Sequence, residues 1–214
     1  IKDFIAENES LLSDQKLSGK KLALISFNEK ANVDSVKNAL TNAGASIELD
    51  IQIKDEVLNT TNLEKINTKL SQKFTKKEEV ISYIANAIKN SSDTSSLASL
   101  EELGLIKVKA NNGTYDTVNA ILVFNGSTSS GKTKFPSLIK PILDQIKEDK
   151  YTVAIATSGE NVGLKEFSKI KVSSIDNIDE AAGRVSLIDL LASSNIIGSF
   201  GNSLEGDKLL PVGK

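Results

Sequence analysis

The stretch VFNGSTSSGKTKFP, residues 123–136, contains Gly126 and, after four intervening residues, Gly131-Lys132-Thr133. This is the spacing of a phosphate-binding loop, in which backbone N–H groups surround the phosphates at the start of a helix. In such a loop the lysine reaches the outer phosphates and the hydroxyl group holds Mg²⁺. The stretch follows the apolar run AILVF, as a phosphate loop follows a strand, so the pattern raises the hypothesis of nucleotide binding.

Three features of the sequence favour an ordinary polar loop instead. Pro136 comes three residues after Thr133, and because proline prefers the first turn of a helix, the helix should begin near Phe135-Pro136. Enzymes of this class also hold Mg²⁺ through an Asp at the end of a second apolar strand. The run 151–157 has no such Asp, and the run that ends in Asp176 is only weakly apolar. The motif also follows a strand late in the chain rather than the strand that opens the fold. We interpret it as a loop and keep nucleotide binding as an alternative.

The composition narrows the possible chemistry. The 214 residues contain no histidine and no cysteine, which removes the usual general base, the thiol nucleophile and the usual metal ligands. The sequence therefore predicts no catalytic residues, no cofactor and no metal site. A net charge of −2 lacks the basic excess of a nucleic-acid-binding protein, so no nucleic-acid partner is expected.

The order of hydrophobic patterns indicates an α/β fold. Residues 21–27 predict a buried strand, 33–44 a helix ending at a glycine, and 46–53 a half-exposed strand that alternates apolar and polar residues. Strand, helix and strand within about thirty residues form a βαβ unit, whose sheet is parallel.

The rest of the chain completes a three-layer, mostly parallel Rossmann-like or flavodoxin-like sheet with about five parallel strands. We expect residues 18–214 to form one domain, with a helical insertion at about 54–104 and an irregular glycine-rich tail from residue 198. Helices are expected at 62–74, 76–90, 96–105, 135–148, 163–170 and 179–194, and further strands at 106–110, as a possible edge, and at 118–124, 151–157 and 171–176.

The segment 171–211 carries the most specific pattern in the chain. It reads KVSSIDNIDEAAGRVSLIDLLASSNIIGSFGNSLEGDKLLP, with Asp176-Asn177 closing a strand and Asp179 shortly before Ala182-Gly183-Arg184. This segment resembles the C-terminal signature of the family named after mycobacterial copper transport protein B (MctB). The opening KLSGKKLALISF is similar to the start of the globular domain in that family.

The resemblance implies an architecture and a location. Family members look like single-pass, membrane-anchored proteins of the bacterial cell envelope, with a coiled coil and then this domain outside the cytoplasm. Residues 1–17 fit the end of the coiled coil, with Ile1, Phe4, Ile5, Leu11 and Leu12 loosely on one helical face. Because coiled coils pair helices, the resemblance implies a homodimer through this helix, an anchor in another segment, and a possible partner protein of the envelope.

The motif also has a purely structural interpretation. Asp176 and Asn177 can satisfy local backbone donors, and Asp179 is a good N-cap for the last helix. Gly183 is small enough for close packing, and Arg184 is expected to pair with Asp176 or Asp179. A ligand site at the carboxyl ends of the strands is the alternative.

Copper handling, which the family name implies, is hard to reconcile with these residues. Copper favours thiolate, thioether and imidazole ligands, and the sequence as it stands offers none. Carboxylate pairs such as Glu78-Glu79 and Glu101-Glu102 would bind Cu(II) weakly and without selectivity. The first hypothesis is a non-enzymatic scaffold or partner-binding module, with copper transport and nucleotide binding as alternatives.

Overall fold

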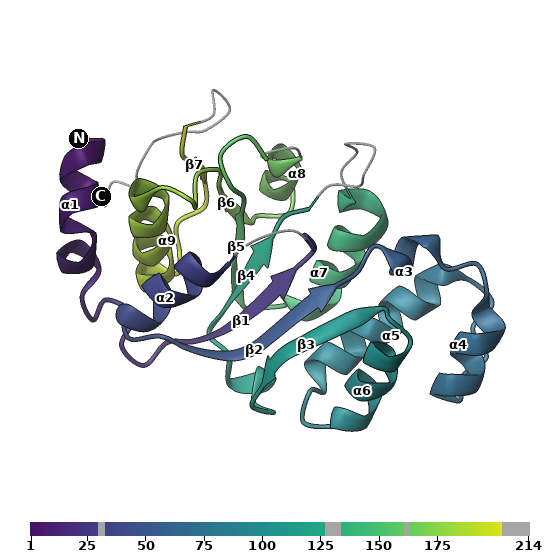
Figure 1. The fold of residues 1–214 in the computed structure, drawn as a ribbon. Coiled ribbons are helices and arrows are strands. Elements are labelled where there is room, and N and C mark those ends of the chain that lie inside the picture. The colour runs from purple at the N-terminus through teal and green to yellow at the C-terminus, as the bar shows by residue number, and fades with distance from the viewer. Residues whose placement is uncertain (30–32, 127–133, 161–162, 203–214) are drawn as a thin grey trace.

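A computed structural model describes residues 1–29, 33–126, 134–160 and 163–202. Within these ranges seven strands form one sheet in the order β3-β2-β1-β4-β5-β6-β7 (Figure 1). All neighbouring strands run parallel except β2 and β3. The strands are β1 (Lys21–Ser26), β2 (Ser46–Ile53), β3 (Ile106–Asn111), β4 (Ala120–Phe124), β5 (Tyr151–Ile155), β6 (Ser173–Ile175) and β7 (Ser199–Phe200).

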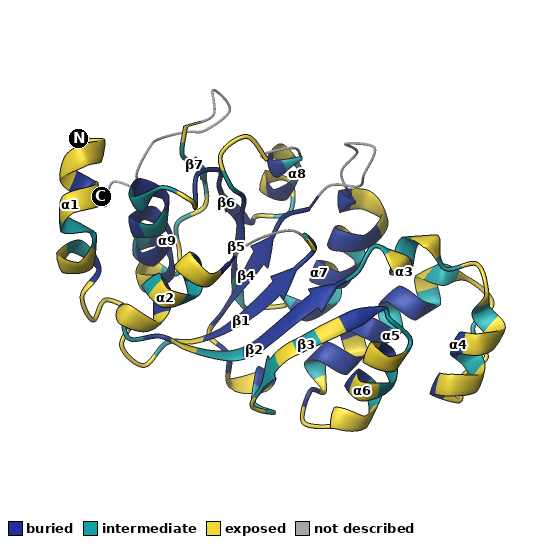
Figure 2. Ribbon diagram, in the orientation of Figure 1, coloured by how far each residue is buried: buried dark blue, intermediate teal, exposed yellow. Residues whose placement is uncertain are grey.

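Helices cover both faces of the sheet, which confirms the predicted three-layer, Rossmann-like architecture (Figure 1). The core on one face is built with side chains of α5, α7 and α8, and the core on the other with side chains of α2 and α9. Figure 2 shows the sheet as a buried layer between them. The helices are α1 (Lys2–Ser13), α2 (Asp34–Asn42), α3 (Glu56–Asn59), α4 (Leu63–Leu70), α5 (Lys77–Lys89), α6 (Thr94–Glu102), α7 (Lys140–Ile146), α8 (Leu164–Ser168) and α9 (Ala181–Ser193), with a 3₁₀ turn at Tyr115–Thr117.

The sheet is larger than expected, and two details of the strands were predicted wrongly. The estimate of about five strands missed β7, a two-residue strand in the tail that was expected to be irregular from residue 198. It forms because Phe200 pairs with Ile175 of β6 and is itself buried. β2 is not half-exposed along its length, because Asp50 and Gln52 are buried together with their apolar neighbours. The edge position expected for β3 is confirmed.

The helices between β2 and β3 belong to the core. Helices expected at 62–74, 76–90 and 96–105 correspond to α4, α5 and α6, while the short α3 was missed. Ile81 and Ile84 of α5 are buried in the same cluster as Ile139 and Ile142, because α5 packs against α7.

The predicted helix at 135–148 is divided in two. Phe135–Ile139 forms a π-helical turn with Pro136 in its first positions, which confirms where the helix begins. The α-helix α7 follows from Lys140, and Pro141 stands in its first turn. A continuous α-helix is interrupted at this point because Pro141 has no N–H group to donate to the preceding turn.

Candidate functional site

The start of α9 is packed tightly against the loop after β6. Gly183 lies so close to the backbone of Asn177 that a Cβ atom there would overlap the carbonyl oxygen and lie 2.5 Å from the carbonyl carbon. Asn177 is fully buried, and its carbonyl oxygen accepts a hydrogen bond from Glu180 N at 2.9 Å. The expectation that Gly183 permits close packing is therefore confirmed, and the group it approaches is backbone.

The side chain of Asp176 links the loop after β6 to the residues that directly follow β7. Its carboxylate is buried and accepts a hydrogen bond from the backbone N–H of Asn202 at 2.7 Å. A Cβ atom on Gly201 would overlap this carboxylate. Asp176 thus serves a backbone donor, as predicted, but one 26 residues away rather than a local one.

Asp179 is not the N-cap of α9, so that prediction is wrong. The N-cap residue is Glu180, which makes no capping hydrogen bond with its side chain. Oδ1 of Asp179 instead accepts hydrogen bonds from the backbone N–H and the hydroxyl of Ser158, at 2.7 and 3.0 Å. Asp179 therefore holds the loop after β5 against the loop that precedes α9.

The partner expected for Arg184 is also wrong. Its guanidinium forms a bidentate ion pair with Glu9 of α1, with Nε–Oε1 and Nη2–Oε2 distances of 2.6 and 2.9 Å. It reaches Asp179 through that residue's carbonyl oxygen, at 2.8 Å. The pKa of Arg184 is raised, chiefly by the hydrogen bonds that its guanidinium donates to Glu9. Sequence reasoning missed Glu9, because nothing in the local pattern relates residues 175 positions apart.

In the part of the chain that the structure describes, three ion pairs join α1 and the segment after it to Glu180 and α9. One is the Glu9–Arg184 pair. In the other two, Nζ of Lys2 lies 3.0 Å from Oε2 of Glu180, and Nζ of Lys16 lies 2.6 Å from Oδ1 of Asp189. Between them Ile5 is buried against Ala182 and Val185. The motif residues at the start of α9 thus form part of the surface against which α1 packs.

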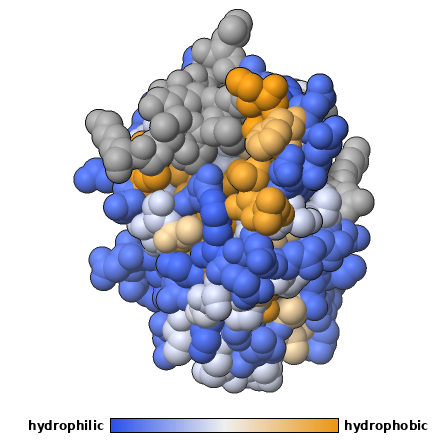
Figure 3. All heavy atoms as spheres, turned by 90° about the vertical axis from the view of Figure 1, so that its left-hand side faces the viewer, coloured by the Kyte–Doolittle hydropathy of each residue, from blue (hydrophilic) through white to orange (hydrophobic). Residues whose placement is uncertain are grey.

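The five apolar residues expected loosely on one face of the N-terminal helix differ in burial. Ile5 and Leu12 face α9, whereas Ile1, Phe4 and Leu11 are 90%, 63% and 77% exposed. Phe4 and Ile5 are successive residues, as are Leu11 and Leu12, and a helix rotates successive residues by about 100°, so only one of each pair can face α9. Figure 3 shows hydrophobic atoms on the side of the molecule that carries α1.

We expect Arg184→Lys to loosen α1 without unfolding the domain. Lysine keeps the charge but cannot form the two parallel hydrogen bonds to Glu9. A loss of about 2 kcal/mol would lower hydrogen-exchange protection of the α1 amides about 30-fold. Lys140→Met, which removes an exposed pair with Asp144, is the matched control and should leave protection unchanged. Equal loss of protection throughout the sheet would contradict a role confined to docking.

Acid should release α1. The pKa of Glu180 is lowered, first by its hydrogen bond with Lys2 and then by Asn177 and Asn202. The folded state therefore binds fewer protons there than the unfolded chain, so this contribution is complete above the usual value of 4.5 and is lost as pH falls through the lowered pKa. Proteolysis of α1 should accelerate between about pH 5 and about pH 3. Glu180→Gln should show faster cleavage at neutral pH, a rate close to that of the wild type in acid, and a weaker dependence on pH.

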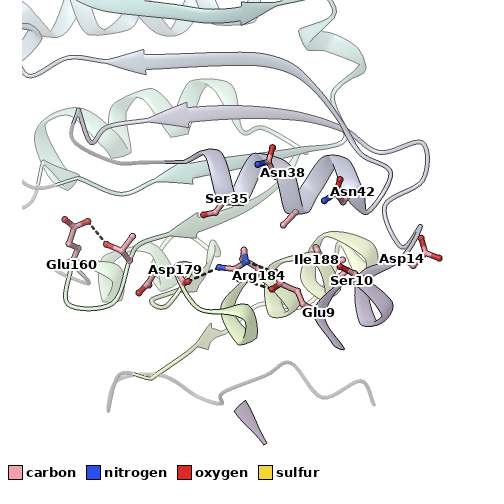
Figure 4. Close-up of a pocket in the computed structure, with 13 residues that line it drawn as sticks. Glu9, Ser10, Asp14, Ser35, Asn38, Asn42, Glu160, Asp179, Arg184 and Ile188 are labelled. Atoms are coloured by element: carbon pink, nitrogen blue, oxygen red, sulfur yellow. Dashed lines mark hydrogen bonds and ion pairs between the residues drawn. The ribbon is translucent and has the colours of Figure 1, made fainter. Parts of the chain in front are cut away.

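A polar groove opens between α1, α2 and α9, beside the docked Arg184. It is a cavity of about 890 Å³ that also reaches Thr157 and Glu160 after β5. Figure 4 shows α2 on one side and α1 with α9 on the other, and the Arg184 interactions with Glu9 and Asp179 at its base. The groove thus brings together motif residues that the sequence predicted, such as Arg184, and residues of α1 that it did not, such as Glu9.

A second polar cluster lies at the carboxyl ends of β1 and β4, where the strand order reverses and where folds of this class bind ligands. The ammonium of Lys134 is buried there, donates to the carbonyl oxygen of Phe27 and pairs with Asp55. Gly126 is buried beside it, and a Cβ atom there would overlap Phe27 O. Gly131, Lys132 and Thr133 of the predicted phosphate loop lie outside the described residues.

One family model matches residues 2–211, nearly the whole chain, and its description is "Copper transport outer membrane protein, MctB". The chain belongs to the MctB family. No curated protein matches it. The family name implies a role in copper transport, and the resemblance inferred from the segment 171–211 is confirmed. No helix within the described ranges of this MctB-family chain has the length and apolar character needed to cross a bilayer.

Three of the four acidic residues considered as copper ligands in this MctB-family domain have structural roles. Glu79 accepts hydrogen bonds from the N–H groups of Thr75 and Lys76 at the start of α5. Glu101 accepts one from Val108 N at 2.7 Å, and Glu102 pairs with Lys69. Among the residues with described positions, no group of three or more His, Cys, Asp and Glu side chains could hold a metal ion.

Proposed function

We propose that this domain is a non-enzymatic interaction module of a membrane-anchored cell-envelope protein, outside the cytoplasm, and that it pairs with a second copy through α1. The observation that carries the proposal is the exposed stripe of Ile1, Phe4 and Leu11 on a helix docked against α9. A docked helix presents such a stripe at a fixed orientation relative to the sheet. The role in copper transport is then indirect, through contacts between proteins.

The spacing of the stripe favours pairing with a second copy. Ile1, Phe4, Asn8 and Leu11 are separated by three, four and three residues, the a and d positions of a coiled coil. Asn8 falls at an a position, where asparagine specifies register in two-stranded coils. An antiparallel pair would bring Glu7 of the two copies together, so the acidic charge favours the parallel arrangement.

Light scattering during gel filtration tests the pairing. Because the stripe is short, we expect a weak dimer, with a dissociation constant above about 1 µM. Leu11→Glu should abolish dimerisation, whereas Ala6→Glu, on another exposed part of α1, should leave it intact. A monomer at every concentration up to about 1 mM would refute the pairing.

Equilibrium dialysis with Cu(I) and Cu(II) tests the indirect role in copper transport. We expect no binding tighter than about 100 µM, because carboxylates alone are poor copper ligands. Micromolar or tighter binding by this chain would overturn the proposal and establish direct copper handling.

A further inference from the structure

We propose that the groove between α1, α2 and α9 binds a neutral, polyhydroxylated ligand, which places it in the saccharide class. Its volume of about 890 Å³ lies within the range of small-molecule sites. Nothing in the proposed pairing through α1 depends on this site, because the groove lies on the α2 side of α9 and the exposed stripe is solvent-facing.

The charged side chains that line the groove are largely satisfied by the protein itself. Both carboxylate oxygens of Glu9 accept hydrogen bonds from Arg184. Asp179 accepts two hydrogen bonds from Ser158, and Glu160 accepts one from the Thr157 hydroxyl at 2.7 Å. These groups form the frame of the groove.

The neutral polar side chains are in the opposite situation. Ser10, Ser35, Asn38 and Asn42 line the groove and form no side-chain hydrogen bond with any other described residue. Ser13 is more informative, because it is only 6% exposed and its hydroxyl is buried without a hydrogen-bond partner in the described part of the chain. A buried hydroxyl of this kind costs free energy unless a partner satisfies it.

The donors and acceptors that remain identify the ligand class. Hydroxyl and primary amide groups each donate and accept, which is what the hydroxyls of a sugar require. Among the described residues that line the groove, an anion would meet four carboxylates, Glu9, Asp14, Glu160 and Asp179, against one guanidinium, that of Arg184. A cation would find three of these four carboxylates already hydrogen-bonded. A neutral polyol is the class that uses the free groups.

The affinity for a monosaccharide should be low. Among the described residues, no aromatic ring lines the groove, and Ala39 and Ile188 contribute its apolar surface. The binding efficiency per atom that is typical of small ligands then gives a dissociation constant on the order of 1 mM for a monosaccharide.

Chemical-shift perturbation on the whole chain tests the site, with galactose, glucose and maltotriose as probes and with spermidine and inorganic phosphate as charged comparisons. We expect at least one sugar to shift amides of α1, α2 and residues 157–160 in a saturable manner. Asn38→Ala and Asn42→Ala should each weaken binding at least fivefold. Alanine favours helix, so neither change should unfold α2.

Asn59→Ala is the matched control, because Asn59 is an exposed asparagine at the end of another helix, α3. It should leave the sugar affinity unchanged. The proposal would be overturned if no sugar gave a saturable shift at about 50 mM. It would also be overturned if Asn38→Ala and Asn42→Ala left the sugar-induced shifts unchanged, or if spermidine alone gave saturable shifts. Because the readout is ligand binding, these outcomes are independent of whether the chain dimerises.

Discussion

Gly183→Ala is expected to destabilise the domain by about 3 kcal/mol. Alanine in place of glycine inside a helix ordinarily stabilises by about 0.5–1 kcal/mol, so the expected sign is the reverse of the usual one. The reason is that the added methyl group would overlap the carbonyl oxygen of Asn177, and both partners are backbone that side-chain rotation cannot move. Either α9 or the loop after β6 must shift.

Urea denaturation measures this loss as a lower midpoint with an unchanged slope, and the melting temperature should fall by about 10 °C. Gly104→Ala provides the comparison, because a Cβ there meets open space and only the positive φ of 73° is unfavourable. We expect a cost of about 1 kcal/mol for that control. A neutral Gly183→Ala would mean that the loop yields easily and that the glycine is not required for packing.

Asp55→Ala is expected to cost about 3 kcal/mol, because it leaves the ammonium of Lys134 buried without its counter-charge. The Lys134 side chain is 2% exposed, whereas that of Asp55 is 34% exposed, so the two partners are not equivalent. Removing the lysine instead leaves a carboxylate that water can reach. Lys134→Met should therefore be the milder single change.

The double variant Asp55→Ala/Lys134→Met separates the charge effect from packing. Once the buried ammonium is gone, deleting Asp55 should cost little, so the double variant should be more stable than Asp55→Ala alone. Chemical denaturation of the four proteins gives the coupling energy, which we expect to be about 2 kcal/mol. Additive effects would show that the Asp55–Lys134 pair does not govern stability at the β1 and β4 ends.

Patterns that act over short distances in the chain predicted most of the fold. The apolar run of β4 and the spacing of Val36 and Leu40 in α2 are enough to identify those elements, because burial of one face dictates the period. β7 was missed because two residues carry no period, and they form a strand only where β6 offers an edge. The π turn before α7 buries Leu138, and it occurs where Pro141 offers no N–H group for a regular α-helical hydrogen bond.

The candidate site was only half predictable for the same reason. The motif around Asp176 and Gly183 stands out in the sequence, but its partner Glu9 belongs to another helix, and ion pairs leave no local pattern. Lys134 could not be identified from the sequence, because the phosphate-loop spacing selects Lys132, two residues earlier. Only the fold shows that Lys134 enters the interior beside Phe27.

The antiparallel strand β3 has a consequence for how this domain can associate. It forms one border of the sheet, and Lys107 and Lys109 are exposed along it. A new strand added there would have to bury or crowd these ammonium groups, which protects natural proteins from fibre-like growth. The opposite border is β7, which is two residues long and too short to template a ladder. Assembly of this chain by strand exchange is therefore disfavoured at both borders of the described sheet.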